Sequence, residues 1–370
     1  MRLQIAGVPI KILRQEYSLK RRTGMNTHRS YFRRTSHRHL SAIVTVILTF
    51  GVLLIISTGC TPESDPMSTG TPDTTETATF PDFITKNEDY FTTRIGGIPN
   101  VDPESFRLEI SGLVDTPAQF TLGELMALPL VSVPLTVECI SNGPNNGRVS
   151  TAIWKGFRLY DLLVSLGLDS TATGVRYLCA DGYYASNTME QIINNDVTGA
   201  LFMNGDTIPP VQGFPLRMLS PGYYGVKQPM WVVGIEVSGQ PLTDYWEERG
   251  WDVAPLIPVN SKIFFPEYGA SAAPGETLLV GGAAYGGTRI AGVAVTTDDG
   301  ATWTDAEIVE SMDADNIWVF WEAKLLPVTT GTLVIKARAT DIYGNMQPAT
   351  DTSYLDGTNT WPYVSVEIVE

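Results

Sequence analysis

Cys139 is the side chain around which the chemistry of this sequence can be interpreted. It ends the short apolar run Thr136-Val-Glu-Cys139, which predicts a strand, and the turn-forming run Ser141-Asn-Gly-Pro144 follows. A thiol where a strand opens into a loop lies where proteins commonly present reactive groups. The residues alone leave three alternatives: half of a disulfide with Cys179, an inert buried thiol, or a metal ligand.

Histidine is confined to one end of the chain, and this excludes several kinds of active site. The three histidines, His28, His37 and His39, all lie in a basic leader. The remainder therefore cannot form a Ser-His-Asp triad, a Cys-His pair, a histidine-ligated haem or an ordinary zinc, copper or non-haem iron site. No Gly-x-Gly-x-x-Gly follows a predicted strand and no Walker loop occurs, so nucleotide binding is not supported.

Composition indicates a globular protein with an acidic surface. The chain has 370 residues, of which 43% are hydrophobic and 18% are charged, and this suits two domains with their own cores. The net charge is -15, although ten of the 25 basic residues precede residue 40. The remainder is therefore strongly acidic, which argues against nucleic acid or an anionic membrane surface as a partner.

The first 60 residues are interpreted as an export signal. Arg33-Arg34 precede an apolar run from Ala42 to Ile56, and Ser57-Thr-Gly-Cys60 follows, resembling a bacterial lipoprotein processing site. A lipid anchor on Cys60 and an uncleaved membrane helix both stay open. So do twin-arginine and ordinary export, and a start at Met25. Either the lipid anchor or the membrane helix would tether the protein to the outer face of the bacterial cytoplasmic membrane.

A solvated linker over residues 61–81, rich in Ser, Thr and Pro, separates this leader from the folded part. Residues 82–258 mix short predicted strands and helices without regular βαβ spacing. Residues 259–370 alternate apolar and polar positions between Gly and Asp turns, which predicts a β-sandwich. The fold class expected is α+β. The segments with the clearest periodicity are strands at 106–112, 175–179 and 201–203, and helices at 122–128, 159–166 and 188–193.

Short motifs follow one another in a definite order along residues 139–231. They are Cys139-Ile-Ser-Asn142, Trp154-Lys-Gly-Phe-Arg-Leu159, Ala180-Asp-Gly-Tyr183, Asn204-Gly-Asp-Thr-Ile-Pro209, Gly213-Phe-Pro-Leu-Arg217, Pro221-Gly-Tyr-Tyr-Gly-Val-Lys227 and Trp231. Further segments follow at Gly281–Gly286, Thr297–Trp303, Trp318–Trp321 and Ala337–Gly344. Together they resemble the sulfite oxidase family of molybdopterin enzymes, in which an immunoglobulin-like domain follows the molybdopterin-binding domain.

The resemblance implies a role for each matching residue. Cys139 becomes the thiolate ligand of molybdenum, a soft donor suited to a metal that also binds the two dithiolene sulfurs of molybdopterin. Arg94 and Lys227 are expected to hold the anionic pterin or an anionic substrate. Cys179 matches no family ligand, and Arg217 is interpreted as a structural strand residue. The other positions expected to line the cofactor pocket are Asn142, Asp181, Gln212 and Gly225.

Three residues depart from the family pattern and affect the expected substrate. Gln212 stands where many relatives have a histidine, Met230 replaces a lysine, and Trp251 occupies the place of a catalytic tyrosine on the substrate side. Because each change removes a polar group, the site is less equipped for sulfite, a small dianion that needs converging cations. The sequence therefore leaves two alternatives for the substrate, a sulfite-like one and a sulfoxide-like one.

The function implied is oxo transfer to or from a small substrate at a molybdenum cofactor. The sequence has no Cys-x-x-Cys-His motif and no spare cysteines, so neither haem nor an iron–sulfur cluster is expected within the chain. Electrons are then exchanged with an external carrier such as a cytochrome or a quinone-linked protein. The C-terminal domain is expected to mediate a homodimer. The alternative is a non-catalytic cell-surface binding module with a vestigial cofactor pocket.

Overall fold

Strands dominate the architecture, and the helices are short. A computed structural model describes residues 79–145, 147–251, 256–351 and 353–370. Its α-helices in these ranges are α2 (Leu122–Met126), α3 (Leu159–Ser165) and α4 (Met189–Asn194). The α+β prediction is therefore corrected to a mostly β fold. Each predicted helix exists, but each soon gives way to a strand or turn.

The N-terminal half of the described chain, residues 79–251, contains a five-stranded sheet with the strand order β2-β1-β10-β5-β6. Within it β1 and β10 are parallel, and the other neighbouring strands are antiparallel. Leu108 and Ile110 of β1 are buried in one core with Leu159 and Leu163 of α3. The bounds are β1 (Arg107–Gly112), β2 (Ala118–Thr121), β5 (Gly174–Cys179), β6 (Tyr184–Thr188) and β10 (Val232–Ser238).

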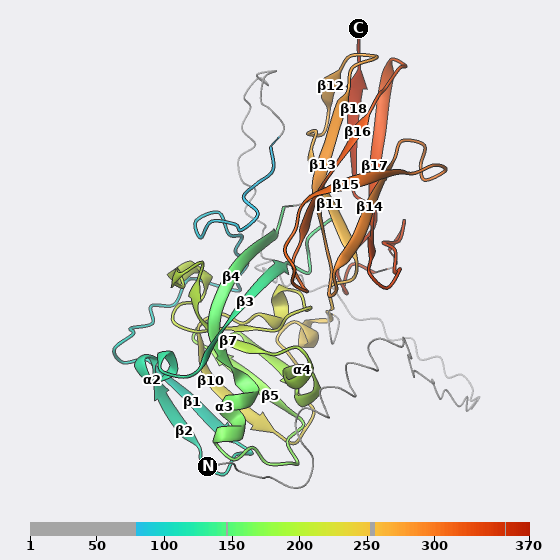
Figure 1. The fold of residues 1–370 in the computed structure, drawn as a ribbon. Helices are drawn as coiled ribbons and strands as arrows, with labels where there is room; N and C mark the ends of the chain where they lie inside the picture. The colour runs from blue at the N-terminus through green and yellow to red at the C-terminus, as the bar shows by residue number, and fades with distance from the viewer. Residues whose placement is uncertain (1–78, 146, 252–255, 352) are drawn as a thin grey trace, which may run out of the picture. The chain divides into compact units, whose positions relative to one another are not determined.

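The second sheet carries Cys139. Its order is β3-β4-β7-β8, and β9 also pairs with β7; β3 and β4 run side by side through most of their length (Figure 1). β3 ends at Glu138, so Cys139 opens the loop that returns to β4 at Val149. The strands are β3 (Leu130–Glu138), β4 (Val149–Arg158), β7 (Thr198–Met203), β8 (Asp206–Thr207) and β9 (Arg217–Leu219).

The close approach of β4 to β7 depends on glycine. A Cβ atom on Gly156 would lie 2.0 Å from the carbonyl oxygen of Gly199. Only a residue without a side chain permits this contact, and a larger one would force the two strands apart. Since β3 pairs with β4, this packing also fixes the strand that ends at the cysteine.

The C-terminal half, described over residues 256–351 and 353–370, contains strands and no helix in these ranges. Its strands follow the path β11-β13-β16-β15-β14-β17-β18-β12, and apolar residues from both ends of that path share one core, including Val280, Trp321, Ala337 and Val366. This agrees with the predicted sandwich; its immunoglobulin-like character stays a prediction. The strands are β11 (Asn260–Phe265), β12 (Ala270–Ala272), β13 (Leu278–Tyr285), β14 (Ile290–Thr296), β15 (Thr304–Glu310), β16 (Val319–Leu325), β17 (Gly331–Asp341) and β18 (Tyr363–Ile368).

Strand β3 is held by the C-terminal half as well as by its own sheet. The backbone N–H of Trp318 donates to Thr136 Oγ1 at 2.8 Å, and the N–H of Thr136 donates to the carbonyl of Asn316 at 2.9 Å. Ile140 and Val149 share a core with Tyr285. The loop with Cys139 is thus attached to both halves of the described chain.

The predicted export signal and most of the linker fall at residues 1–78, outside the described residues. Within the part of the chain that the structure describes, no helix is long and apolar enough to cross a membrane.

Candidate functional site

A cavity in the N-terminal half brings five of the predicted site residues together. Its empty space, counted out to the open mouth, is about 640 Å³. The predicted residues on its wall are Arg94, Cys139, Asp181, Gln212 and Gly225. The remaining wall is largely apolar or aromatic and includes Phe91, Ile95, Tyr183, Val226, Pro229, Met230 and Trp246.

Cys139 is buried at the wall, and its sulfur has hydroxyl groups on two sides. Ser141 Oγ lies 3.2 Å from Cys139 Sγ, and Thr93 Oγ1 donates to the same sulfur at 3.8 Å. The backbone N–H of Cys139 donates to the carbonyl of Arg148 at 3.0 Å, which fixes the start of the loop. A thiolate at this position would have two hydroxyl groups close enough to solvate it.

Cys179 does not take part in this site. Both Cys139 and Cys179 are free thiols, which excludes the disulfide between them. Cys179 packs in the core of the first sheet, and burial raises the pKa of its thiol well above the usual range. It is therefore a small buried apolar residue, as the sequence predicts.

Arg217 is a buried cation on the cavity wall. It is 5% exposed, and no carboxylate in the described ranges forms an ion pair with it. Its Nη1 donates to the carbonyl and Oε1 of Gln212 at 3.3 and 3.2 Å, and its guanidinium lies over the rings of Trp154 and Tyr90. Its Nε has no hydrogen-bond partner, and burial lowers the pKa of the guanidinium. A buried unpaired charge is costly, so this cation indicates a place for an anion.

Gln212 fixes the orientation of Arg217 and of the segment beside it. It is 1% exposed, and its Nε2 donates to the Tyr90 carbonyl and to Thr92 Oγ1, both at 2.8 Å. With its Oε1 accepting from Arg217, the amide of Gln212 bonds two parts of the wall.

The loops with Asp181 and Gly225 are bonded to each other. Asp181 Oδ1 accepts from the backbone N–H of Tyr183 at 3.0 Å in the turn between β5 and β6, and the Tyr183 hydroxyl donates to the carbonyl of Val226 at 2.6 Å. A Cβ atom on Gly225 would lie 3.3 Å from the carbonyl oxygen of Glu138. Glycine therefore lets the backbone at residue 225 pass close to the end of β3, next to Cys139.

Arg94 is exposed at the mouth of the cavity. Its Nε donates to the carbonyl of Gly96 at 3.0 Å, and no acidic side chain of the described chain forms an ion pair with it. Its guanidinium therefore carries a charge at the cavity that no described acid neutralises.

Lys227 was predicted to hold the pterin, but its ammonium group is not on this wall. It is 4% exposed, and its Nζ lies 2.5 Å from Asp244 Oδ2 and 3.3 Å from Glu247 Oε1, and it donates to the carbonyl of Ser186 at 3.1 Å. These acceptors use the three protons of the ammonium. The structure therefore places Lys227 in a buried ion pair and not among the residues of the cavity wall.

Asn142 and Trp251 are also not among the residues of the wall. Asn142 is buried, with its amide donating to Glu138 Oε1 at 2.9 Å and its Oδ1 accepting from the backbone of Arg148. The Trp251 ring packs edge-on against Trp246, with centroids 6.3 Å apart. Trp251 thus lies next to a residue of the wall, Trp246, without being part of the wall itself.

Comparison with known proteins assigns the family. Residues 95–246 match the oxidoreductase molybdopterin binding domain, and residues 253–370 match the Mo-co oxidoreductase dimerisation domain. Sulfite oxidase of Gallus gallus is 30% identical over 314 residues, which cover 72% of this chain and 68% of that protein. The chain belongs to the sulfite oxidase family of molybdopterin-dependent oxidoreductases.

Other relatives are consistent with this assignment. Mitochondrial sulfite oxidase of Rattus norvegicus is 29% identical over 344 residues, which cover 78% of this chain but only 62% of that protein's length. The sulfane dehydrogenase SoxCD of Paracoccus pantotrophus has the same fold, with a TM-score of 0.69 over 78% of this chain and 83% of that one. The identity of that pair is 22%, so the likeness concerns the fold.

Replacing Lys227 by Met should strongly destabilise the cofactor-free protein, because Asp244 and Glu247 would be left buried without their cation. We expect a loss of about 3–5 kcal/mol, measured by urea unfolding. The control is Lys336→Met, because the ion pair of Lys336 with Asp299 is more exposed, and we expect it to cost about 1 kcal/mol or less. Equal effects of the two variants, with cofactor loss only in Lys227→Met, would instead support the predicted contact with the pterin.

Proposed function

We propose that this protein is a molybdenum cofactor-dependent oxidoreductase that transfers an oxo group to or from a small substrate. The observation that carries the proposal is the pairing, on one cavity wall, of the Cys139 sulfur with the unpaired buried cation of Arg217. A soft anionic donor serves a metal, and a buried guanidinium serves an anion. Molybdopterin with its bound metal offers both partners in one molecule.

The residues present fit this cofactor. Cys139 would bind the metal, with Thr93 and Ser141 donating to its sulfur. Arg217 would hold an anionic group of the pterin, because it lies on the cavity wall and forms no ion pair with a described acid. Gly225 leaves the backbone open to close approach. When bound, the cofactor supplies the redox chemistry and the exchangeable oxo group.

The chain's own residues would position the substrate and limit its access to water. Phe91, Ile95, Pro229 and Trp246 give the cavity apolar walls, which exclude water around a bound substrate. Arg94 at the mouth would attract an anionic group, and its exposure allows it to move.

The substrate we propose carries less charge than sulfite, such as a sulfoxide. Met230 supports this choice, because it lies on the cavity wall where family members usually have a lysine. A thioether cannot donate a hydrogen bond to an anionic oxygen, whereas a lysine can. Trp251 supports it less directly, since it lies behind Trp246.

Electrons would be exchanged with an external carrier, a cytochrome or quinone-linked protein. We further propose a homodimer formed through residues 253–370, which match the dimerisation domain. The leader and linker at residues 1–81 support the proposal that the protein is tethered to the outer face of the bacterial cytoplasmic membrane.

Arg217→Gln should reduce the molybdenum retained by protein that is expressed with a supply of cofactor. Loss of a charged hydrogen bond to a buried anion should weaken binding by about 2–4 kcal/mol, which corresponds to more than tenfold. Arg217→Lys keeps the charge and should retain more metal than Arg217→Gln. Molybdenum would be measured by elemental analysis of folded protein. Full retention in Arg217→Gln would overturn the role given to Arg217. No molybdenum in the unaltered protein would instead favour the non-catalytic binding module.

Met230→Lys should raise sulfite oxidation relative to sulfoxide reduction. A cation at this wall supplies a partner for an anionic substrate, and the change in selectivity should be at least tenfold, or about 1.4 kcal/mol. Met230→Gln matches the length without the charge and should shift selectivity much less. Steady-state kcat/KM for both substrates gives the comparison. Ordinary enzymatic efficiency of the unaltered protein toward sulfite would overturn the substrate proposal.

A further inference from the structure

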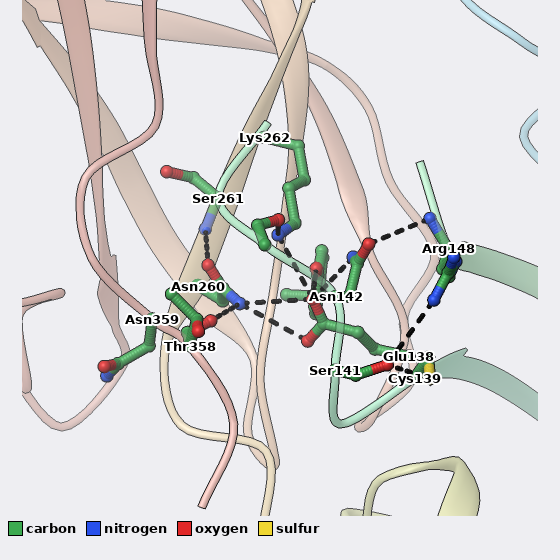
Figure 2. A network of polar contacts seen from close by, with 12 residues as sticks. Glu138, Cys139, Ser141, Asn142, Arg148, Asn260, Ser261, Lys262, Thr358 and Asn359 are labelled. Carbon is green, nitrogen blue, oxygen red and sulfur yellow. Dashed lines mark hydrogen bonds and ion pairs between the residues drawn. The ribbon is translucent and has the colours of Figure 1, made fainter. Parts of the chain in front are cut away.

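A buried carboxylate stands directly before Cys139 and receives hydrogen bonds from both halves of the described chain. Glu138 is 0% exposed at the end of β3. Asn142 Nδ2 donates to its Oε1 at 2.9 Å, and the Tyr285 hydroxyl donates to the same oxygen at 2.6 Å. Lys262 Nζ lies 3.2 Å from Oε1, and Asn260 Nδ2 donates to Oε2 at 3.3 Å (Figure 2).

Three of these donors, Asn260, Lys262 and Tyr285, come from the C-terminal half. Lys262 is also 2% exposed, and its Nζ makes a second contact, donating to the carbonyl of Gly143 at 2.7 Å. One ammonium group therefore bonds to Glu138 before the cysteine and to Gly143 after it. A side chain of β11 therefore contacts the chain on both sides of Cys139, at Glu138 and at Gly143.

Further hydrogen bonds hold the first residues of the loop and join them to the residue before β4. The backbone N–H of Asn142 donates to the carbonyl of Cys139 at 2.9 Å, and the N–H of Arg148 donates to Asn142 Oδ1 at 3.0 Å. The side chain of Asn142 thus joins the carboxylate of Glu138 to the returning strand, as the dashed lines in Figure 2 show. Moving the backbone of Cys139 away from β3 would break several of these bonds together.

The donors of the C-terminal half are themselves fixed in place. Gln347 Nε2 donates to Asn260 Oδ1 at 3.2 Å, and Ser261 Oγ donates to Gln347 Oε1 at 2.6 Å. Asn260 Nδ2 also donates to the carbonyl of Thr358 at 3.2 Å. The start of β11 therefore approaches Glu138 as a preorganised set of donors.

We propose that Glu138 and Lys262 are positioning residues, through which the C-terminal half sets the position of the Cys139 sulfur. This inference rests on the proposed function, in which that sulfur binds the metal. Neither residue lies on the cavity wall, so neither contacts substrate. A buried ion pair contributes little stability compared with a well-packed apolar pair, so the geometry that it imposes is the better reason for its place beside the cysteine.

The test measures how often the loop opens in cofactor-free, folded protein. Cys139 and Cys179 are both buried free thiols, and iodoacetamide alkylates each at its own rate. Because Cys139 also lines the cavity, opening of its loop is measured as a change in its rate from that of the parent, with Cys179 as the internal reference. Lys262→Met should raise the rate at Cys139 relative to Cys179 by roughly tenfold, because local opening no longer breaks the contacts with Glu138 and Gly143. Peptide mass spectrometry resolves the two sites.

A second variant keeps the test interpretable if the Lys262→Met protein does not fold because Glu138 is left buried without its cation. Glu138→Gln combined with Lys262→Met removes both charges and should fold, but the loop should still open more often than in the parent. Thr136→Val is the matched control. It breaks a buried bond between β3 and Trp318 two residues before Glu138, without touching the loop. Its ratio of Cys139 to Cys179 alkylation should equal that of the parent.

An unchanged ratio in both Lys262 variants would overturn the inference, as would an equal rise in Thr136→Val. Because the measurement needs no metal, it is separate from the test of the proposed function. A protein that never binds molybdenum could still show the predicted change in alkylation. A protein that binds molybdenum could equally fail to show it.

Discussion

The structure depends on the burial of charge beside the cysteine. Glu138 loses its contact with water completely, and a carboxylate in that position is stable only if donors surround it. Two amides, a hydroxyl and an ammonium provide them, mostly from the C-terminal half. This joins the two halves where the chain leaves β3 for the cysteine loop. The C-terminal half therefore braces the site as well as packing as a separate core.

Three buried cations in the described chain show how environment separates structural roles from binding roles. Lys262 is paired with Glu138, and Lys227 with Asp244 and Glu247. Arg217 has aromatic rings and an amide around it but forms no ion pair with a described acid, and it lies on the cavity wall. An ion left unpaired by its own protein has the strongest reason to bind a ligand.

Of the two cations predicted to hold the pterin, the cavity wall includes Arg94 but not Lys227, and it also includes Arg217. The resemblance to the sulfite oxidase family implied that Cys139, Asp181, Gln212 and Gly225 share one pocket, and all four line the cavity. The sequence alone could not show that Arg217 lies on the cavity wall whereas Lys227 does not. The acids that pair with Lys227 come from a loop after β10, and proximity across that distance in sequence is decided by tertiary packing. A signal for Arg217 was present, since an arginine stood in an apolar strand with no nearby acid.

The helices show a similar division between local and distant causes. Capping boxes begin α2, with Thr121 and Glu124, and α4, with Thr188 and Gln191. The starts of these two helices can therefore be predicted from a few adjacent residues. The overall balance between helix and strand was not predicted. The order of strands in the two N-terminal sheets depends on pairings between distant segments, including the parallel pairing of β1 with β10.

X-ray absorption at the molybdenum edge tests most directly whether the Cys139 sulfur binds the metal. Spectra of the unaltered protein, Cys139→Ser and Cys179→Ala would be compared per molybdenum atom, so that partial occupancy does not affect the count. The account predicts one sulfur neighbour fewer in Cys139→Ser, because a hydroxyl replaces the thiolate, and no change in Cys179→Ala. The same number of sulfur neighbours in all three proteins would contradict it.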